Sequence, residues 1–157
     1  MAHVKWLTQI TVLTKPFSGY FQGEKYVLRY RDGTEKPVQE MQVKSSITSP
    51  TANDTLGCCK AYSIRGHAWS GRTNISKVEI SVDGGNSWVK AQLTEPSSEY
   101  SWQQWNYSWT PCSPGRHTIL ARATNSDGIQ QPSKSVWNEL GYQVNGVKPI
   151  TIHVAQQ

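Results

Sequence analysis

The sequence has little of what membrane spans and export signals require. No apolar run approaches the roughly 20 residues of a membrane-spanning helix. The first residues, MAHVKWLTQ, do not form a signal peptide. We therefore expect a soluble chain without a membrane partner or an export signal, and the compartment stays open.

Cysteine is scarce as well, with three residues at Cys58, Cys59 and Cys112. An odd number leaves at least one thiol unpaired within the chain, and adjacent cysteines have poor geometry for an ordinary disulfide. No C-x-x-C pair occurs, which argues against a thiolate zinc site. The four histidines are also far apart in sequence, so we expect no metal site: His3, His67, His117 and His153.

Catalytic and nucleic-acid signatures are missing too. The sequence contains no HExxH, Walker loop, GxSxG or paired-carboxylate pattern. Sixteen Lys and Arg give a net charge of +5, but they are spread along the chain without a basic run. These absences favour a binding or structural role over an enzyme, and they exclude an obvious nucleic-acid partner.

One stretch, residues 65–93, carries the strongest structural signal. From Ile75 to Val82 apolar and polar residues alternate, which is the period of a half-buried strand. Residues 83–86, DGGN, supply the positive φ angles of a tight turn, and a second alternating run follows. The pattern predicts a β-hairpin with these side chains inward: Val78, Ile80, Val82, Val89, Ala91 and Leu93. Trp69 and Trp88 should be substantially buried beside it.

Strand patterns recur along the chain with turn signals between them, and no stretch has a period of 3.6 residues. We expect irregular or turn structure at residues 17–30, 31–33, 49–57, 94–101, 110–115 and 131–147. Further strands are expected at 4–13, near Val27, and at 41–47, 62–68, 105–109, 118–124 and 150–154. Short strands at this spacing predict an all-β fold, an immunoglobulin-like β-sandwich, in a single domain over residues 1–157.

Two local motifs have competing interpretations. Residues 81–88, SVDGGNSW, look like the Asp-box of sialidases, but that motif recurs in each propeller blade and here occurs once. The simpler interpretation is a hairpin whose Asp83 carboxylate binds nearby backbone amides. Trp105, Tyr107 and Trp109 form an aromatic ladder that is either core or an exposed sugar-binding row.

An ordered set of segments resembles the C-terminal dimerisation domain of sulfite-oxidase-type molybdenum oxidoreductases. The most specific are VKSSITSP at 43–50, GHAWSG at 66–71 and KVEISVDGGNSW at 77–88. Shorter matches are VKWL at 4–7, Trp105 and Trp109, ARA at 121–123, DG at 127–128, QP at 131–132 and WN at 137–138. The resemblance spans Val4 to Val154, and the paired tryptophans favour the core interpretation of the ladder.

In that family a larger preceding domain binds molybdenum–molybdopterin and supplies the cysteine ligand. The resemblance implies that this domain lies outside the 157 residues, so this chain would bind no cofactor, catalyse no reaction and use none of its cysteines as the molybdenum ligand. Sulfite-oxidising members also carry an Arg two residues after the Trp-Asn pair. Leu140 stands at that position here and lacks the forked donors that an oxyanion prefers. Sulfite specificity of any parent enzyme is therefore in doubt.

The resemblance implies a non-catalytic interaction module that forms a homodimer and contacts a molybdenum-cofactor domain. The aromatic segment that follows the first expected strand has more apolar area than an ordinary solvated loop. It therefore predicts the contact with the molybdenum-cofactor domain. The candidate partner-contact residues are Phe17, Tyr20, Phe21 and Tyr26, with Trp137 and Asn138 as weaker ones. The alternative is a stand-alone ligand-binding sandwich, such as a carbohydrate-binding module.

Overall fold

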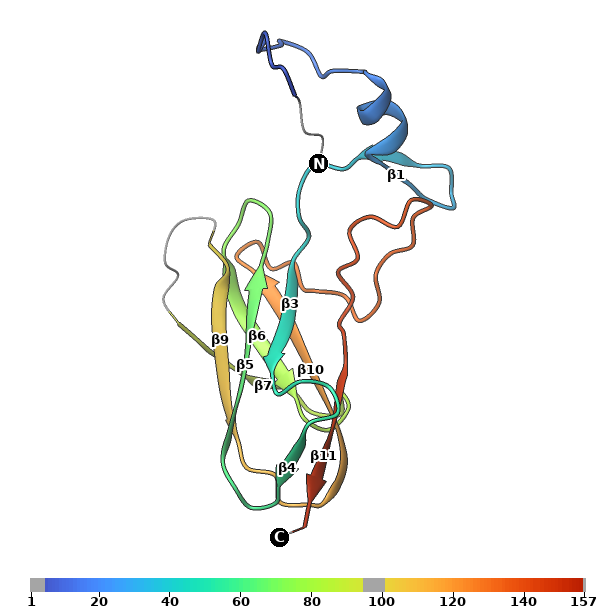
Figure 1. Ribbon diagram of the computed structural model, residues 1–157. Coiled ribbons are helices and arrows are strands. Elements are labelled where there is room, and N and C mark those ends of the chain that lie inside the picture. The colour runs from blue at the N-terminus through green and yellow to red at the C-terminus, as the bar shows by residue number, and fades with distance from the viewer. Residues whose placement is uncertain (1–4, 95–100, 157) are drawn as a thin grey trace. The chain divides into compact units, whose positions relative to one another are not determined.

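The computed structural model describes residues 5–94 and 101–156 and divides into two compact units. Unit 1 consists of Met1–Val38 and Asn138–Tyr142, and unit 2 consists of Gln39–Trp137 and Gln143–Gln157. Figure 1 shows unit 2 as the larger, strand-rich unit. Each unit has its own elements and its own buried residues.

Unit 1 is built around a short hairpin. Its elements are the π-helical turn η1 (Phe21–Lys25) and the antiparallel strands β1 (Val27–Arg29) and β2 (Glu35–Pro37). Val27 and Leu28 are its buried apolar residues. The turn predicted at residues 31–33 is confirmed, since Gly33 adopts a φ of 82° and donates its N–H to the Tyr30 carbonyl at 3.1 Å. The short strand predicted near Val27 is confirmed as well.

The strand expected at residues 4–13 is wrong over its described part, residues 5–13, which contain no strand. Their β-branched content favours an extended backbone, but a strand also needs a neighbour to exchange hydrogen bonds with. None of the described strands pairs with this segment. Its apolar side chains are consequently left on the surface.

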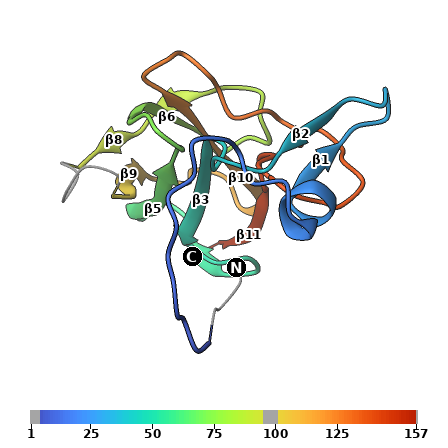
Figure 2. The same ribbon diagram turned by 90° about the horizontal axis from the view of Figure 1, so that it is seen from above.

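Unit 2 is a sandwich of two sheets that face each other, as Figures 1 and 2 show. The first sheet has the order β3-β5-β9-β8, with β3 at Lys44–Ser49, β5 at Tyr62–Trp69, β9 at Gln103–Trp109 and β8 at Gln92–Leu93. The second has the order β4-β11-β10-β6-β7, with β4 at Thr55–Gly57, β11 at Ile150–Ala155, β10 at Gly115–Asn125, β6 at Ile75–Ser81 and β7 at Val89–Lys90.

The all-β, immunoglobulin-like fold predicted from the sequence is confirmed by this sandwich. Every pairing is antiparallel except that of β11 with β4. Strand β4 lies where only a loop was expected, because its three residues are too few to show an alternating pattern.

The core follows the two-residue period of the central strands. Strands β6 and β10 pair in register, with Val78 opposite Ala123 and Ile80 opposite Ala121. The buried core comprises Val43, Cys58, Ile64, Ala68, Ile75, Val78, Ile80, Ala91, Trp105, Trp109, Ile119, Ala121, Ala123, Ile152 and Val154. Bulky residues of one strand thus face small residues of the next.

The hairpin prediction is confirmed for its first strand and wrong for part of its second. Val89 is 48% exposed, although the alternation placed it inward. The chain crosses from one sheet to the other at this point: β7 pairs with β6, β8 pairs with β9, and the buried Ala91 lies between them. This crossing breaks the alternation of the second strand, and Leu93 packs only at the margin of the core. Val82, which follows the last residue of β6 and leads into the turn, is likewise only partly buried.

Trp69 and Trp88, predicted to be substantially buried, are partly buried. Each is fixed by a polar or aromatic contact at the sandwich surface. The Trp88 indole N–H donates to the Gly85 carbonyl at 3.1 Å, and the Trp69 ring stacks on Trp102 with centroids 4.9 Å apart. Both residues therefore line the surface of unit 2 instead of filling its centre.

Candidate interaction site

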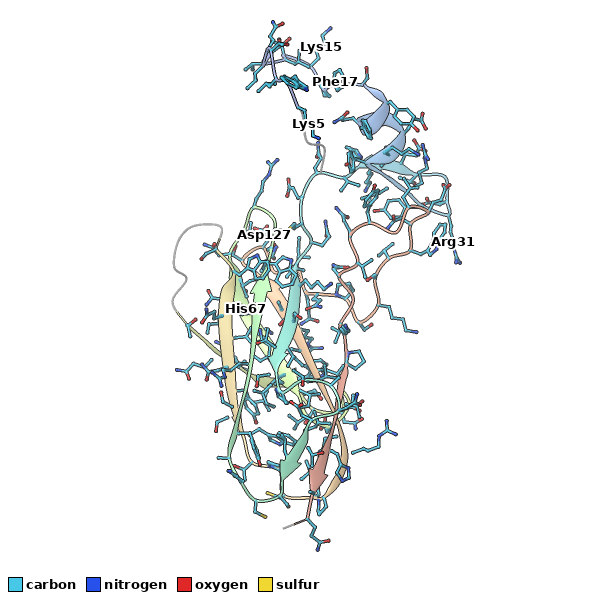
Figure 3. The ribbon with its side chains drawn as sticks, in the orientation of Figure 1. Lys5, Lys15, Phe17, Arg31, His67 and Asp127 are labelled. Atoms are coloured by element: carbon cyan, nitrogen blue, oxygen red, sulfur yellow. The ribbon has the colours of Figure 1, made fainter. Side chains whose placement is uncertain are left out.

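Four of the predicted contact residues gather in unit 1. Phe17, Tyr20 and Phe21 are 64%, 61% and 51% exposed, and Tyr26 is partly buried. The rings of the last three form a contiguous row: Tyr20 and Phe21 meet edge to face with centroids 5.6 Å apart, and Phe21 lies 6.2 Å from Tyr26. Figure 3 shows Phe17 on the segment that leads into η1. The row ends on Tyr142, 6.1 Å from Tyr26, a member that the sequence analysis missed.

Backbone hydrogen bonds fix this aromatic segment. The Gly19 carbonyl accepts from the N–H groups of Gln22 and Gly23 at 3.0 and 2.9 Å, and the Tyr26 N–H donates to the Phe21 carbonyl at 2.6 Å. The last bond closes a turn of five residues, the wider π-helical form that is frequent at functional sites. The exposed rings therefore belong to a defined turn.

A charged cluster flanks the aromatic row. The Arg29 guanidinium donates to Glu35 at 2.7 Å and to Glu24 at 3.0 Å. These bonds raise the pKa of Arg29, and the bond to Glu35 contributes most. The cluster ties η1 to the β1–β2 hairpin. The Lys25 ammonium lies 5.5 Å from the centre of the Tyr20 ring, so a charged group also borders the aromatic row, as in the polar rim of a contact patch.

The segment before the aromatic row adds a second group of exposed apolar side chains. They are Trp6, Leu7, Ile10, Val12 and Leu13, each more than half exposed. All five belong to the strand expected at residues 4–13. The signal that could have revealed the exposed surface is the lack of any nearby alternating partner in the first 40 residues.

The two weaker candidates lie in different units. Trp137 belongs to unit 2 and is 51% exposed, whereas Asn138 belongs to unit 1 and is 7% exposed. The Asn138 amide closes the loop: it donates to the Tyr142 carbonyl at 2.7 Å and accepts the Tyr142 N–H at 2.9 Å. Asn138 thus positions the loop 138–142, which carries Leu140 and Tyr142.

The aromatic ladder of β9 is mainly core. Trp105 is 1% and Trp109 8% exposed, and Tyr107 packs against the same core. The sugar-binding alternative depended on a flat exposed row formed by these three residues. Their burial removes the observation on which that alternative rested.

The Asp-box hairpin has the structural role expected of it. The Asp83 carboxylate accepts hydrogen bonds from the Ser81 hydroxyl at 2.7 Å and from the Ser87 N–H at 3.0 Å. The Asn86 amide in turn donates to the Asp83 carbonyl at 2.7 Å. Because the first two bonds favour the charged carboxylate, they hold the pKa of Asp83 well below its usual range, with the Ser81 hydroxyl contributing most.

We expect Asp83→Asn to lower the free energy of unfolding at neutral pH. The difference between the two proteins should become smaller in acid. A depressed pKa in the folded state contributes stability above the unfolded value near 3.8, and that stability is lost as the pH falls below it. Urea unfolding of both proteins between about pH 7 and pH 3 measures the difference. A difference in unfolding free energy that stays constant across this range would contradict the assignment.

The thiols do not form a ligand set. Cys58 is buried, and its Sγ lies 3.6 Å from that of Cys59, whereas Cys59 and Cys112 are exposed. The contact with Cys59, followed by burial, raises the pKa of Cys58 and disfavours its thiolate. Within residues 5–94 and 101–156 no three His, Cys, Asp or Glu side chains come together as a metal site. No helix in the described part of the chain is long and apolar enough to cross a membrane.

Comparisons with known proteins agree with this architecture. Residues 35–155 match the family model of the Mo-co oxidoreductase dimerisation domain. The chain is 27% identical to mitochondrial sulfite oxidase of Homo sapiens over 98% of its length and 31% of that protein. It is 26% identical to NADH nitrate reductase of Hordeum vulgare over 98% of its length and 20% of that protein.

A solved structure gives the same fold. The crystal structure of the sulfane dehydrogenase SoxCD from Paracoccus pantotrophus matches 86% of this chain and 36% of its own, with a TM-score of 0.70 and 24% identity. The chain thus spans about a fifth to a third of the length of the two curated relatives described above.

Proposed function

Because the chain belongs to the family of Mo-co oxidoreductase dimerisation domains, we propose that it is the non-catalytic dimerisation module of a sulfite-oxidase-type molybdenum oxidoreductase. The observation that carries the proposal is that unit 2, nearly all of which lies inside the matched residues 35–155, forms a complete and well-packed sandwich. Unit 1 adds a group of exposed aromatic and aliphatic side chains, and exposed apolar patches mark contact with other protein surfaces.

Unit 1 is proposed to contact the domain that holds the molybdenum cofactor. The family model begins at residue 35, so most of unit 1 lies outside it. The alignments with sulfite oxidase and nitrate reductase nevertheless include 98% of the chain. Unit 1 therefore corresponds to a part of these longer proteins outside the dimerisation model, where Phe17, Tyr20, Phe21 and Tyr26 would meet a neighbouring domain.

The residues of this chain do not fit a molybdenum–molybdopterin site. The metal needs a thiolate, but the Cys58 thiol is buried, and among the described residues neither it nor the exposed Cys59 and Cys112 belongs to a group of three possible ligands. Leu140, which is 37% exposed, offers no donor to an oxyanion. Cofactor binding and redox chemistry are hence assigned to another domain, and the proposed role of this chain is to hold two protomers together.

Self-association tests the proposal. We expect a reversible two-fold dimer that buries on the order of 1,200–2,000 Å² in total, with a dissociation constant on the order of micromolar. Sedimentation equilibrium up to several hundred micromolar protein measures the mass directly. A chain that remains strictly monomeric over that range would contradict the dimerisation role.

A double variant separates the two proposed surfaces. Phe17→Ser with Phe21→Ser removes exposed apolar area from unit 1 and leaves the sandwich untouched. Because unit 1 is assigned to the cofactor domain, the double variant should dimerise like the unaltered chain. Loss of dimerisation would instead assign the apolar segment to the dimer contact.

A further inference from the structure

Unit 2 contains a cleft of about 640 Å³ on the outer face of its five-stranded sheet. Apolar side chains form much of its wall, among them Trp88, Leu120, Pro132 and Val147. Its polar side chains are those of Arg122, Gln130, Gln131 and Ser133, and none of the lining residues is acidic. A largely apolar cleft of this size with a few fixed polar groups is the usual form of a small-molecule site.

Arg122 supplies a positioned cation to this cleft. Its guanidinium lies 4.0 Å from the centre of the Trp88 ring, and its Nε donates to Glu79 at 3.1 Å. Lys77 and Gln130 also bind the Glu79 carboxylate, at 3.2 and 3.3 Å. Burial would raise the pKa of Glu79, but the bonds from Lys77 and Arg122 outweigh it and lower the pKa. Glu79 therefore stays charged and orients Arg122 without occupying its terminal donors.

Gln131 supplies a second donor, which is buried. The residue is 2% exposed, and its Oε1 accepts the N–H groups of Ser45 at 2.8 Å and Ala123 at 3.2 Å. Both N–H groups need an acceptor, so the amide cannot rotate to exchange its oxygen and nitrogen. Its Nε2 has no acceptor within the described chain. A buried donor without a partner is unfavourable, and Gln131 lines the cleft, so a ligand acceptor that reaches this buried nitrogen would satisfy it.

We propose that this cleft binds a small organic carboxylate with a flat apolar body. The carboxylate would accept from the Arg122 guanidinium and the Gln131 amide, since charge-assisted bonds to a fork of donors are the strong ones. The apolar body would lie against Leu120, Pro132 and the Trp88 ring. All residues that line the cleft belong to unit 2.

Titration of the purified chain with benzoate tests the site, with nuclear magnetic resonance of its amide and indole groups as the readout. We expect saturable shifts of the Gln131 side-chain amide and the Trp88 indole, with a dissociation constant on the order of millimolar for so small a ligand. Benzamide has the same shape without the charge, and sulfate has charge without the apolar body. Each should bind at least about tenfold more weakly.

Arginine variants locate the site. Arg122→Gln should weaken benzoate binding at least about tenfold, whereas Arg116→Gln, which removes the same charge from an exposed position of the same strand, should leave it unchanged. The proposal is overturned if benzoate produces no saturable shifts, if benzamide binds as tightly, or if the two variants behave alike. The comparison of benzoate with benzamide needs no variant, so it decides the matter even if Arg122→Gln does not fold.

Discussion

Replacing Gly66 with Ala is expected to cost more than about 3 kcal/mol of folding free energy, at or above the upper end for an overpacked core. Gly66 pairs with Trp105 across the β5–β9 ladder, and the indole occupies the space above the glycine. An added Cβ would fall on the Ser46 carbonyl oxygen and within 2.6 Å of Trp105 Cε2. Neither neighbour can move away, because the Ser46 carbonyl belongs to the backbone of β3 and the Trp105 side chain is 1% exposed.

Gly23→Ala is the matched control, since no atom lies within 4 Å of the added Cβ there. It should change stability by only a few tenths of a kcal/mol to about 1 kcal/mol. Urea unfolding followed by tryptophan fluorescence measures both variants. If Gly66→Ala proved as stable as Gly23→Ala, the close contact between Gly66 and Trp105 would be wrong.

The sequence allowed the central strands to be predicted because one face of each is buried against a facing sheet. Residues 118–124 illustrate this: Ile119, Ala121 and Ala123 are all buried, whereas the residues that alternate with them are only partly buried. The prediction failed where long-range pairing decides the outcome. Residues 5–13 have the composition of a strand but no partner, and Val89 leaves the pattern where the chain changes sheet.

The exposed aromatic segment was predictable from its composition and not from its period. Phe17, Tyr20 and Phe21 have the i, i+3, i+4 spacing of a helical face, but Gly19 and Gly23 interrupt the segment, which left an aromatic loop as the expectation. The cleft could not be predicted. Arg122 and Gln131 are ordinary polar residues in sequence, and only the packing of residues 130–133 and 147–149 beside β10 brings them into one cavity.

Ile80→Ala is expected to destabilise the chain by about 2–5 kcal/mol, because it loses the transfer free energy of the removed atoms and leaves a cavity. Ile80 is 1% exposed and lies in β6 between Ala121 of β10 and Val89 of β7. Its small neighbour Ala121 offers little side chain that could fill the space. Chemical unfolding monitored by circular dichroism gives the free-energy difference.

Val89→Ala is the informative control, since Val89 is the direct cross-strand partner of Ile80 yet is 48% exposed. Simple alternation predicts that both residues face the core and that both substitutions strongly lower the free energy of unfolding. The crossing of the chain between the sheets at Ala91 predicts that Val89→Ala changes stability by no more than about 1 kcal/mol, as expected for a surface position with some β-propensity. Equal losses of unfolding free energy for the two variants would support an uninterrupted hairpin. A loss below about 0.5 kcal/mol for Ile80→Ala would contradict the assignment of Ile80 to the core.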